Sequence, residues 1–88
     1  MSSDWTYHAS LNTNDSLVFF HAIEHQTDYT YKPLVVAKQI TTGINYRYIC
    51  IATPKDATGM SHFSMVAIHK PFNEAGYVVA IHPIDCHL

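Results

Sequence analysis

Apolar and polar side chains separate at helical spacing along residues 17–27, a stretch that contains no Gly or Pro. Residues 12–16, just before it, are rich in the residue types that cap helix N-termini. We therefore predict an amphipathic helix that lies on an apolar surface. Its apolar side carries Phe19, Ala22, Ile23 and Gln26, with Phe20 at the margin, and its polar side carries His21, Glu24, His25 and Asp28.

The remaining pattern is typical of strands. Four apolar runs rich in β-branched and aromatic residues follow the helix. They cover residues 34–39, 45–53, 62–70 and 77–84. Pro33 suits a strand start, residues 54–61 predict a loop and residues 71–76 predict a turn. Residues 5–11 are either a short first strand or an extended arm.

One helix followed by four antiparallel strands predicts an α+β domain of two layers. A single helix does not cover both faces of such a sheet, so the sheet is expected to wrap around it. The 88 residues are enough for one domain, residues 1–88, with a small core.

Composition narrows the possible functions. Apolar residues make up 48% of the chain, as in globular proteins, while charged residues make up only 14%. The net charge is -2 with no basic block, so we expect no nucleic-acid or anionic-membrane partner. No apolar run approaches the length of a membrane span, and the N-terminus lacks a secretory pattern. The protein is expected in the cytoplasm if the sequence is complete, and outside the cell if a signal was removed.

Seven His residues allow the formal charge to move from -2 to +5 on full protonation (-2 + 7). We expect most of them to be exposed and to have no switching role. Cys50 lies in a predicted strand and Cys86 near the C-terminus. With a strand between them, their Cα atoms are expected about 10 Å apart, too far for a disulfide, so both should be free thiols.

No catalytic motif is convincing. His21, Glu24 and His25 form an H-x-x-E-H string like that of some zinc enzymes. A third ligand and a closed site have no obvious source, so we interpret the string as a solvated helix face. Cys50, between Ile49 and Ile51, is expected to be inert. We predict no enzyme activity, no cofactor and no metal.

The segment Gln39, Ile40, Thr41, Thr42 and Gly43 lies between two predicted strands and predicts a hairpin tip. We expect Gly43 to supply a positive φ there. This segment resembles the Gln-x-Val-x-Gly hairpin of the cystatins. Lys70, Pro71 and Phe72 resemble the family's second inhibitory loop, usually Lys-Pro-Trp, and residues 17–26 resemble the helix signature of plant cystatins, with matches at Leu17, Phe20, Glu24 and His25.

The resemblance covers about residues 17–84 and has specific departures. Thr41 stands where the family usually has Val, and Phe72 where it has Trp. A hydroxyl buried unpaired at an interface costs about 1–3 kcal/mol. No Gly precedes the helix, and Gln26 stands in place of Asn.

The resemblance implies a cystatin-like fold and reversible, non-covalent inhibition of papain-like cysteine proteases. Two hairpin tips would wedge into the protease cleft, with Gln39, Ile40, Thr41, Thr42, Gly43, Pro71 and Phe72 as the protease-binding residues. On this view Gly43→Glu abolishes inhibition while the fold survives.

The alternative is a binding or assembly module of the same fold without inhibitory activity. Such a module would use the open sheet face, through either Tyr46 and Tyr48 or Arg47. The protein is expected to be a monomer or a dimer. A dimer would form through the uncharged edge of residues 34–37 or by exchange of the helix and first strands through the Gly43 hairpin.

Overall fold

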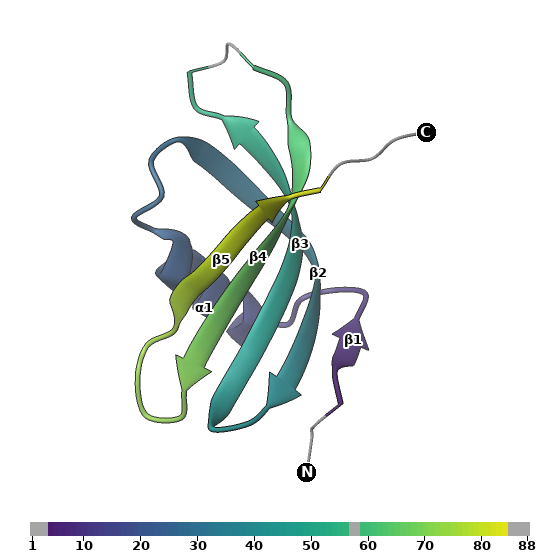
Figure 1. The fold of residues 1–88 in the computed structure, drawn as a ribbon, viewed down its shortest axis with the longest axis vertical. Helices are drawn as coiled ribbons and strands as arrows, with labels where there is room; N and C mark the ends of the chain where they lie inside the picture. The colour runs from purple at the N-terminus through teal and green to yellow at the C-terminus, as the bar shows by residue number, and fades with distance from the viewer. Residues whose placement is uncertain (1–3, 57–58, 85–88) are drawn as a thin grey trace.

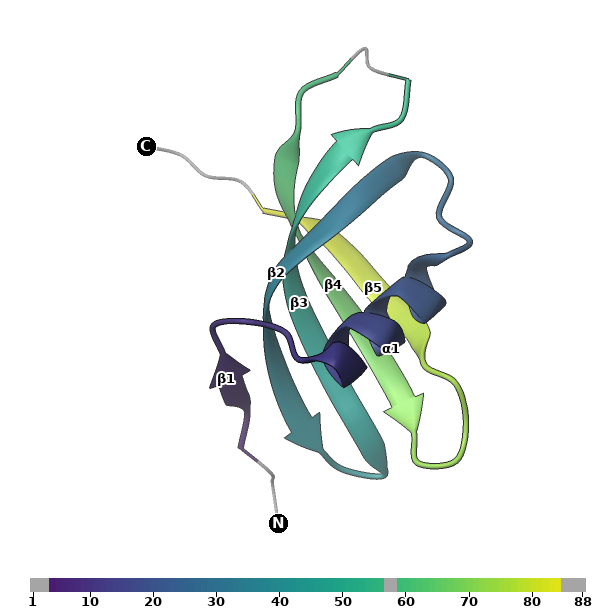
Figure 2. The same cartoon turned by 180° about the vertical axis from the view of Figure 1, so that it is seen from behind.

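An 11-residue helix packs on one face of a five-stranded antiparallel sheet in the computed structural model, which describes residues 4–56 and 59–84 (Figures 1 and 2). The sheet is a meander in the order β1-β2-β3-β4-β5, and the helix lies between β1 and β2 in the chain. The α+β prediction is confirmed. The elements are β1 (Thr6–His8), α1 (Thr13–Ile23), β2 (Tyr29–Ile40), β3 (Gly43–Pro54), β4 (His62–Pro71) and β5 (Tyr77–Pro83).

Helix α1 begins and ends earlier than the predicted span of residues 17–27. Asn12 is its N-cap: the Asn12 side chain accepts a hydrogen bond from the Asp15 N–H at 2.7 Å. The Asp15 carboxylate in turn accepts one from the Asn12 N–H at 3.2 Å. This reciprocal cap satisfies two N–H groups that a helix start otherwise leaves unpaired, so the helix starts at Thr13.

The end of α1 is fixed by a backbone bond. The Gln26 N–H donates to the Ile23 carbonyl at 2.9 Å, which closes a turn after the last helical residue. Within this span, the helix buries Val18 and Phe19 against the sheet, while Leu17 and Phe20 are exposed.

Strand β2 begins at Tyr29, five residues before the predicted start (34 − 29). Pro33 therefore does not start the strand but lies inside it. The register against β3 shifts between Pro33 and Val35, because proline has no N–H to give to the ladder. The strand continues on both sides of this irregularity.

The pleat of β3 separates two faces. Tyr46, Tyr48 and Cys50 are almost fully buried beneath the helix. The centroids of the Phe19 and Tyr48 rings lie 4.8 Å apart. Arg47 points to the opposite face and is exposed. Of the two outward sets left open by the sequence, the structure selects the one with Arg47. The buried core contains Val18, Phe19, Val36, Tyr46, Tyr48, Cys50, Val66 and Ile68.

The expected bare edge at residues 34–37 is only partly present. Strand β1 pairs with β2, with His8 opposite Val36, Tyr7 opposite Ala37 and Thr6 opposite Lys38. The edge prediction is therefore wrong for Val36 and Ala37. Strand β5 forms the other edge of the sheet.

Candidate functional site

The β2–β3 hairpin tip and the β4–β5 turn lie side by side at one end of the sheet, at the bottom of Figure 1. Gly43 is the register partner of Pro71, and Ile44 is that of Lys70. Antiparallel pairing of β3 with β4 thus brings together two segments that are far apart in the sequence. All seven predicted protease-binding residues lie at this end, in or next to the two loops.

Gly43 is needed for a different reason from the one predicted. Its φ lies outside the left-handed region, so the expected positive φ is wrong. The constraint is instead the close approach of β4. A Cβ on Gly43 would overlap the Lys70 carbonyl oxygen and lie 2.9 Å from the Pro71 Cα. Gly43 is the residue that lets the two loops pack against each other.

A network of side chains holds the hairpin tip. Asn45 Nδ2 donates to Gln39 Oε1 at 3.1 Å and lies 3.3 Å from Thr41 Oγ1. Asn45 Oδ1 lies 2.6 Å from His69 Nδ1 on β4. Because the Asn45 amide oxygen can only accept, His69 donates from Nδ1. The sequence motifs named Gln39 and Thr41 but missed the part played by Asn45 and His69.

The tips present apolar and hydroxyl groups to solvent. Ile40 is 62% exposed and Phe72 is 58% exposed. Thr41 and Thr42 between them are also exposed, and the Thr41 N–H donates to the Gly43 carbonyl at 2.9 Å. This end of the sheet therefore exposes an aliphatic group on one tip and an aromatic ring on the other.

The N-terminal segment runs toward the same end. Because Thr6 pairs with Lys38, the chain before β1 leads toward the hairpin tip. Asp4, Thr6 and Lys38 share a shallow hollow with Ile40 and Ile44. Three segments therefore converge here: the residues before β1, the β2–β3 tip and the β4–β5 turn.

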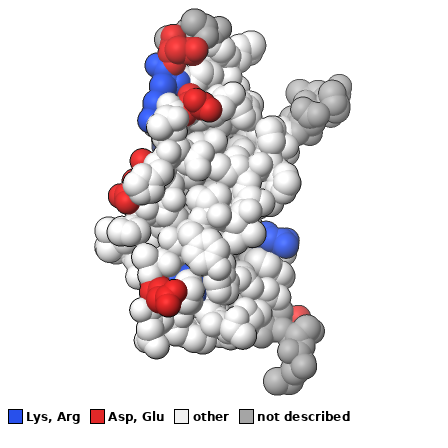
Figure 3. Space-filling view, turned by 60° about the vertical axis from the view of Figure 1, so that its left-hand side comes forward, with Lys and Arg blue, Asp and Glu red and all other residues white. Residues whose placement is uncertain are grey.

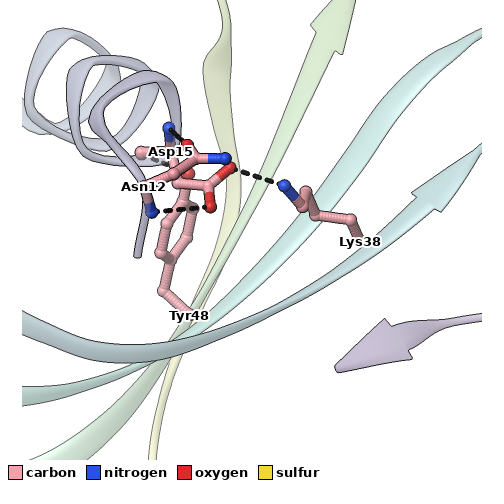
Figure 4. A network of polar contacts seen from close by, with 4 residues as sticks. All are labelled: Asn12, Asp15, Lys38 and Tyr48. Atoms are coloured by element: carbon pink, nitrogen blue, oxygen red, sulfur yellow. Dashed lines mark hydrogen bonds and ion pairs between the residues drawn. The ribbon is translucent and has the colours of Figure 1, made fainter. Parts of the chain in front are cut away.

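Lys38, two residues before the end of β2, ties this end of the sheet to the helix (Figure 4). Its Nζ donates to Asp15 Oδ1 at 2.8 Å, and the Asp15 side chain is only 2% exposed. The Tyr48 hydroxyl donates to the Asp15 carbonyl at 2.8 Å. Burial, followed by the charge of Asp15, raises the pKa of the Tyr46 hydroxyl beside this group.

The structure places the candidate nucleophile Cys50 and the His25–Glu24 pair of the H-x-x-E-H string in different surroundings. Cys50 is fully buried, and burial raises the pKa of its thiol to about 12, so it carries no thiolate at neutral pH. His25 Nε2 lies 3.4 Å from Glu24 Oε1, with the His25 side chain 90% exposed. No group of three or more His, Cys, Asp or Glu that suits a metal occurs in residues 4–56 and 59–84. Cys86 lies outside the described residues.

Charged side chains are few on the view of Figure 3, and its centre is formed largely by uncharged residues. Within the described part of the chain, no helix has the length and apolar character needed to cross a bilayer. No family model, no curated protein and no solved structure matches this chain.

Proposed function

We propose that this protein has a cystatin-like fold and is a reversible, non-covalent inhibitor of papain-like cysteine proteases, without enzyme activity of its own. The observation that carries the proposal is the pairing of Gly43 with Pro71, which sets the two motif-bearing loops side by side at one end of the sheet. A wedge needs both tips on the same edge, and the sequence motifs alone did not require that arrangement.

The wedge would act by filling the protease cleft beside its catalytic cysteine. Phe72, following the stiff Pro71, would be the aromatic anchor, and Ile40 would be the aliphatic contact of the other tip. Neither loop needs to place a peptide bond for attack. Binding would then leave the inhibitor uncut and dissociable.

The departure at Thr41 is compatible with this role. Its hydroxyl is within 3.3 Å of Asn45 Nδ2, so it already has an internal donor. Burial in an interface would therefore leave the hydroxyl oxygen with a donor and only the O–H in need of a partner, so the cost of about 1–3 kcal/mol expected from sequence does not apply in full.

Order in the tips supports tight docking. The Gln39–Asn45–His69 contacts restrain the hairpin, and the Lys38–Asp15 pair fixes the strand that leads to it. A loop that is already ordered loses less conformational entropy on binding.

The experiment is a titration of active papain with the purified protein, using a fluorogenic peptide substrate. We expect inhibition at nanomolar to low micromolar protein, recovery of activity on dilution, and an intact inhibitor mass after incubation. Absence of inhibition at tens of micromolar, or loss of inhibition as the protein is cleaved, would overturn the proposal.

A further inference from the structure

The sheet face opposite α1 carries no helix (Figure 1). Register places Val35, Ala37, Ile49, Met65 and Ala67 on this outer face, because each pairs with the others or with Arg47, which points away from the core. We call this surface the outer face. Its apolar positions would suit a core, yet only Ala37 is buried, while Ile49, Met65 and Ala67 are half-buried and Val35 is exposed.

A hollow crosses the outer face at its β1 side. Its walls include Trp5, Tyr7, Val35, Ile49, Met65 and Arg47. The lining is mainly apolar or aromatic, with Arg47 as its cation and His8 as a further polar group. Sites for small molecules commonly have this composition, an apolar wall with a few polar groups that fix orientation.

Arg47 is the charged group of the hollow. Its Cζ lies 4.4 Å from the centroid of the Trp5 ring, a cation–π contact. The ion pairs His25–Glu24 and Lys38–Asp15 in the described part of the chain do not involve this guanidinium. A guanidinium stacked on an aromatic ring keeps N–H donors at its edge, which suit a carboxylate in a two-bond arrangement.

The charged residues of the outer face favour an anionic ligand. Its paired positions include Arg47 and Lys32, and none of them is Asp or Glu. A second copy of the chain stacked on this face would bury cations without a carboxylate opposite them, at a high desolvation cost. An anionic partner with an apolar body satisfies both features of the hollow.

We propose that the hollow binds a small carboxylate amphiphile, such as a free medium-chain fatty acid. The alkyl chain lies along Val35, Ile49 and Met65, and the carboxylate accepts hydrogen bonds from the Arg47 guanidinium beside Trp5. This site is on the sheet face rather than at the loop end, so it is independent of the protease-binding proposal.

Decanoate, below its micelle-forming concentration, is the probe, and decanol is the neutral match of equal chain length. Binding is measured by calorimetry and by the emission of Trp5, the single Trp of the chain. We expect saturable decanoate binding, with decanol about tenfold weaker because a charge-assisted hydrogen bond is lost.

Arg47→Met should weaken decanoate binding about tenfold and leave decanol binding unchanged. Lys32→Met is the matched control, an exposed cation on the same face outside the hollow, and should bind decanoate like the parent protein. Thermal unfolding checks that each variant is folded. The proposal is overturned if decanoate does not saturate a site, if decanol binds equally well, if both Met variants behave alike, or if sedimentation shows a dimer that decanoate does not compete with.

Discussion

Glycine is required at position 43 because β4 lies close to its backbone, not because of its own backbone dihedrals. The β4 backbone at Lys70 and Pro71 occupies the space in which any Cβ would lie. A substitution at Gly43 must therefore move one loop away from the other. Gly43→Glu, which the sequence suggested as a clean test of inhibition, would disturb the fold and the site together.

Gly43→Ala is expected to destabilise the protein by roughly 1–3 kcal/mol, because the added methyl group overlaps backbone that has little freedom to shift. Urea unfolding measures the change. Gly59→Ala serves as the control: it is an exposed glycine whose nearest contact to a new Cβ is the Pro54 side chain at 3.1 Å, and it should lose much less. Equal losses at the two sites would contradict the close-approach explanation.

Cys50 makes stability depend on pH in the alkaline range. Burial raises the pKa of its thiol from an ordinary value of 9.0 to about 12 in the folded protein. Above about pH 9 the unfolded chain releases this proton while the folded chain keeps it, so stability falls as pH rises toward 12. Below pH 9 the contribution is fully present.

We expect the free energy of unfolding to fall by about 2 kcal/mol between roughly pH 8 and pH 10.5 from this thiol. Buried Tyr48, whose pKa burial also raises, acts in the same direction. Urea unfolding at several pH values is the measurement. Cys50→Ala removes the thiol and should make the alkaline fall shallower, with the Tyr48 contribution remaining; an unchanged alkaline slope in that variant would rule out Cys50 as a source.

At the scale of elements, the polar link between α1 and β2 explains where the helix begins. Asp15 is buried, which is unusual for a carboxylate on a helix. Because a charged residue breaks the hydrophobic pattern, the first turn of the helix was not predicted. Lys38 comes from 23 residues further along the chain, so the pairing depends on tertiary contact. The N-cap residue types were visible in the sequence, whereas the partner that allows Asp15 to be buried was not.

Lys38→Met should cost roughly 2–4 kcal/mol of stability, because it leaves the buried Asp15 carboxylate without its cation. Lys32→Met, an exposed lysine on the same strand, should change stability by about 0.5 kcal/mol or less. Chemical denaturation compares the two. Similar small losses would mean that the Asp15–Lys38 pair contributes little.

Asn45 tests whether order within the hairpin tip, as distinct from direct contact with the protease, contributes to inhibition. Asn45 donates to Gln39 and lies near Thr41 but is itself half-buried on β3. Asn45→Ala is expected to weaken papain inhibition about three- to tenfold, because docking must then order the Gln39 and Thr41 side chains.

Thr53→Ala at the far end of β3 is the control for Asn45→Ala, since it also removes a side-chain hydrogen bond from the same strand. It should leave inhibition unchanged. If both variants inhibit like the parent protein, the network at the tip does not contribute to the activity.

Across the whole molecule, features set by the local sequence pattern could be predicted, whereas features set by the pairing of distant segments could not. The end of β3 at Pro54 and the starts of β4 at His62 and β5 at Tyr77 agree with strand runs bounded by Pro and Gly. The early start of β2 was missed because Pro33 normally ends such a pattern, and a register shift beside it lets the strand continue. The motif residues named from the sequence lie together at one end of the sheet, but their supports Asn45, His69 and Asp15 depend on pairings between distant segments.

Self-association remains a prediction at this scale. The described structure has an edge strand, β5, whose Tyr77 and Val79 are exposed, and it has a hairpin at Gly43 through which strands could exchange. Sedimentation of the purified protein over a range of concentrations distinguishes a monomer from either dimer.

Phe72 offers the sharpest test of the proposed protease-binding wedge at the paired loop tips. Its ring is 58% exposed, so Phe72→Ala removes a contact surface with little effect on the fold. Phe63→Ala is the matched control: Phe63 is 43% exposed and lies near the start of β4, at the other end of the sheet.

Inhibition constants for papain should be measured for the parent protein and both variants. We expect inhibition by the parent and by Phe63→Ala, and at least a roughly tenfold weaker constant for Phe72→Ala, as for an aromatic anchor in an interface. Equal inhibition by the two variants, or no inhibition by the parent protein, would contradict the proposed wedge.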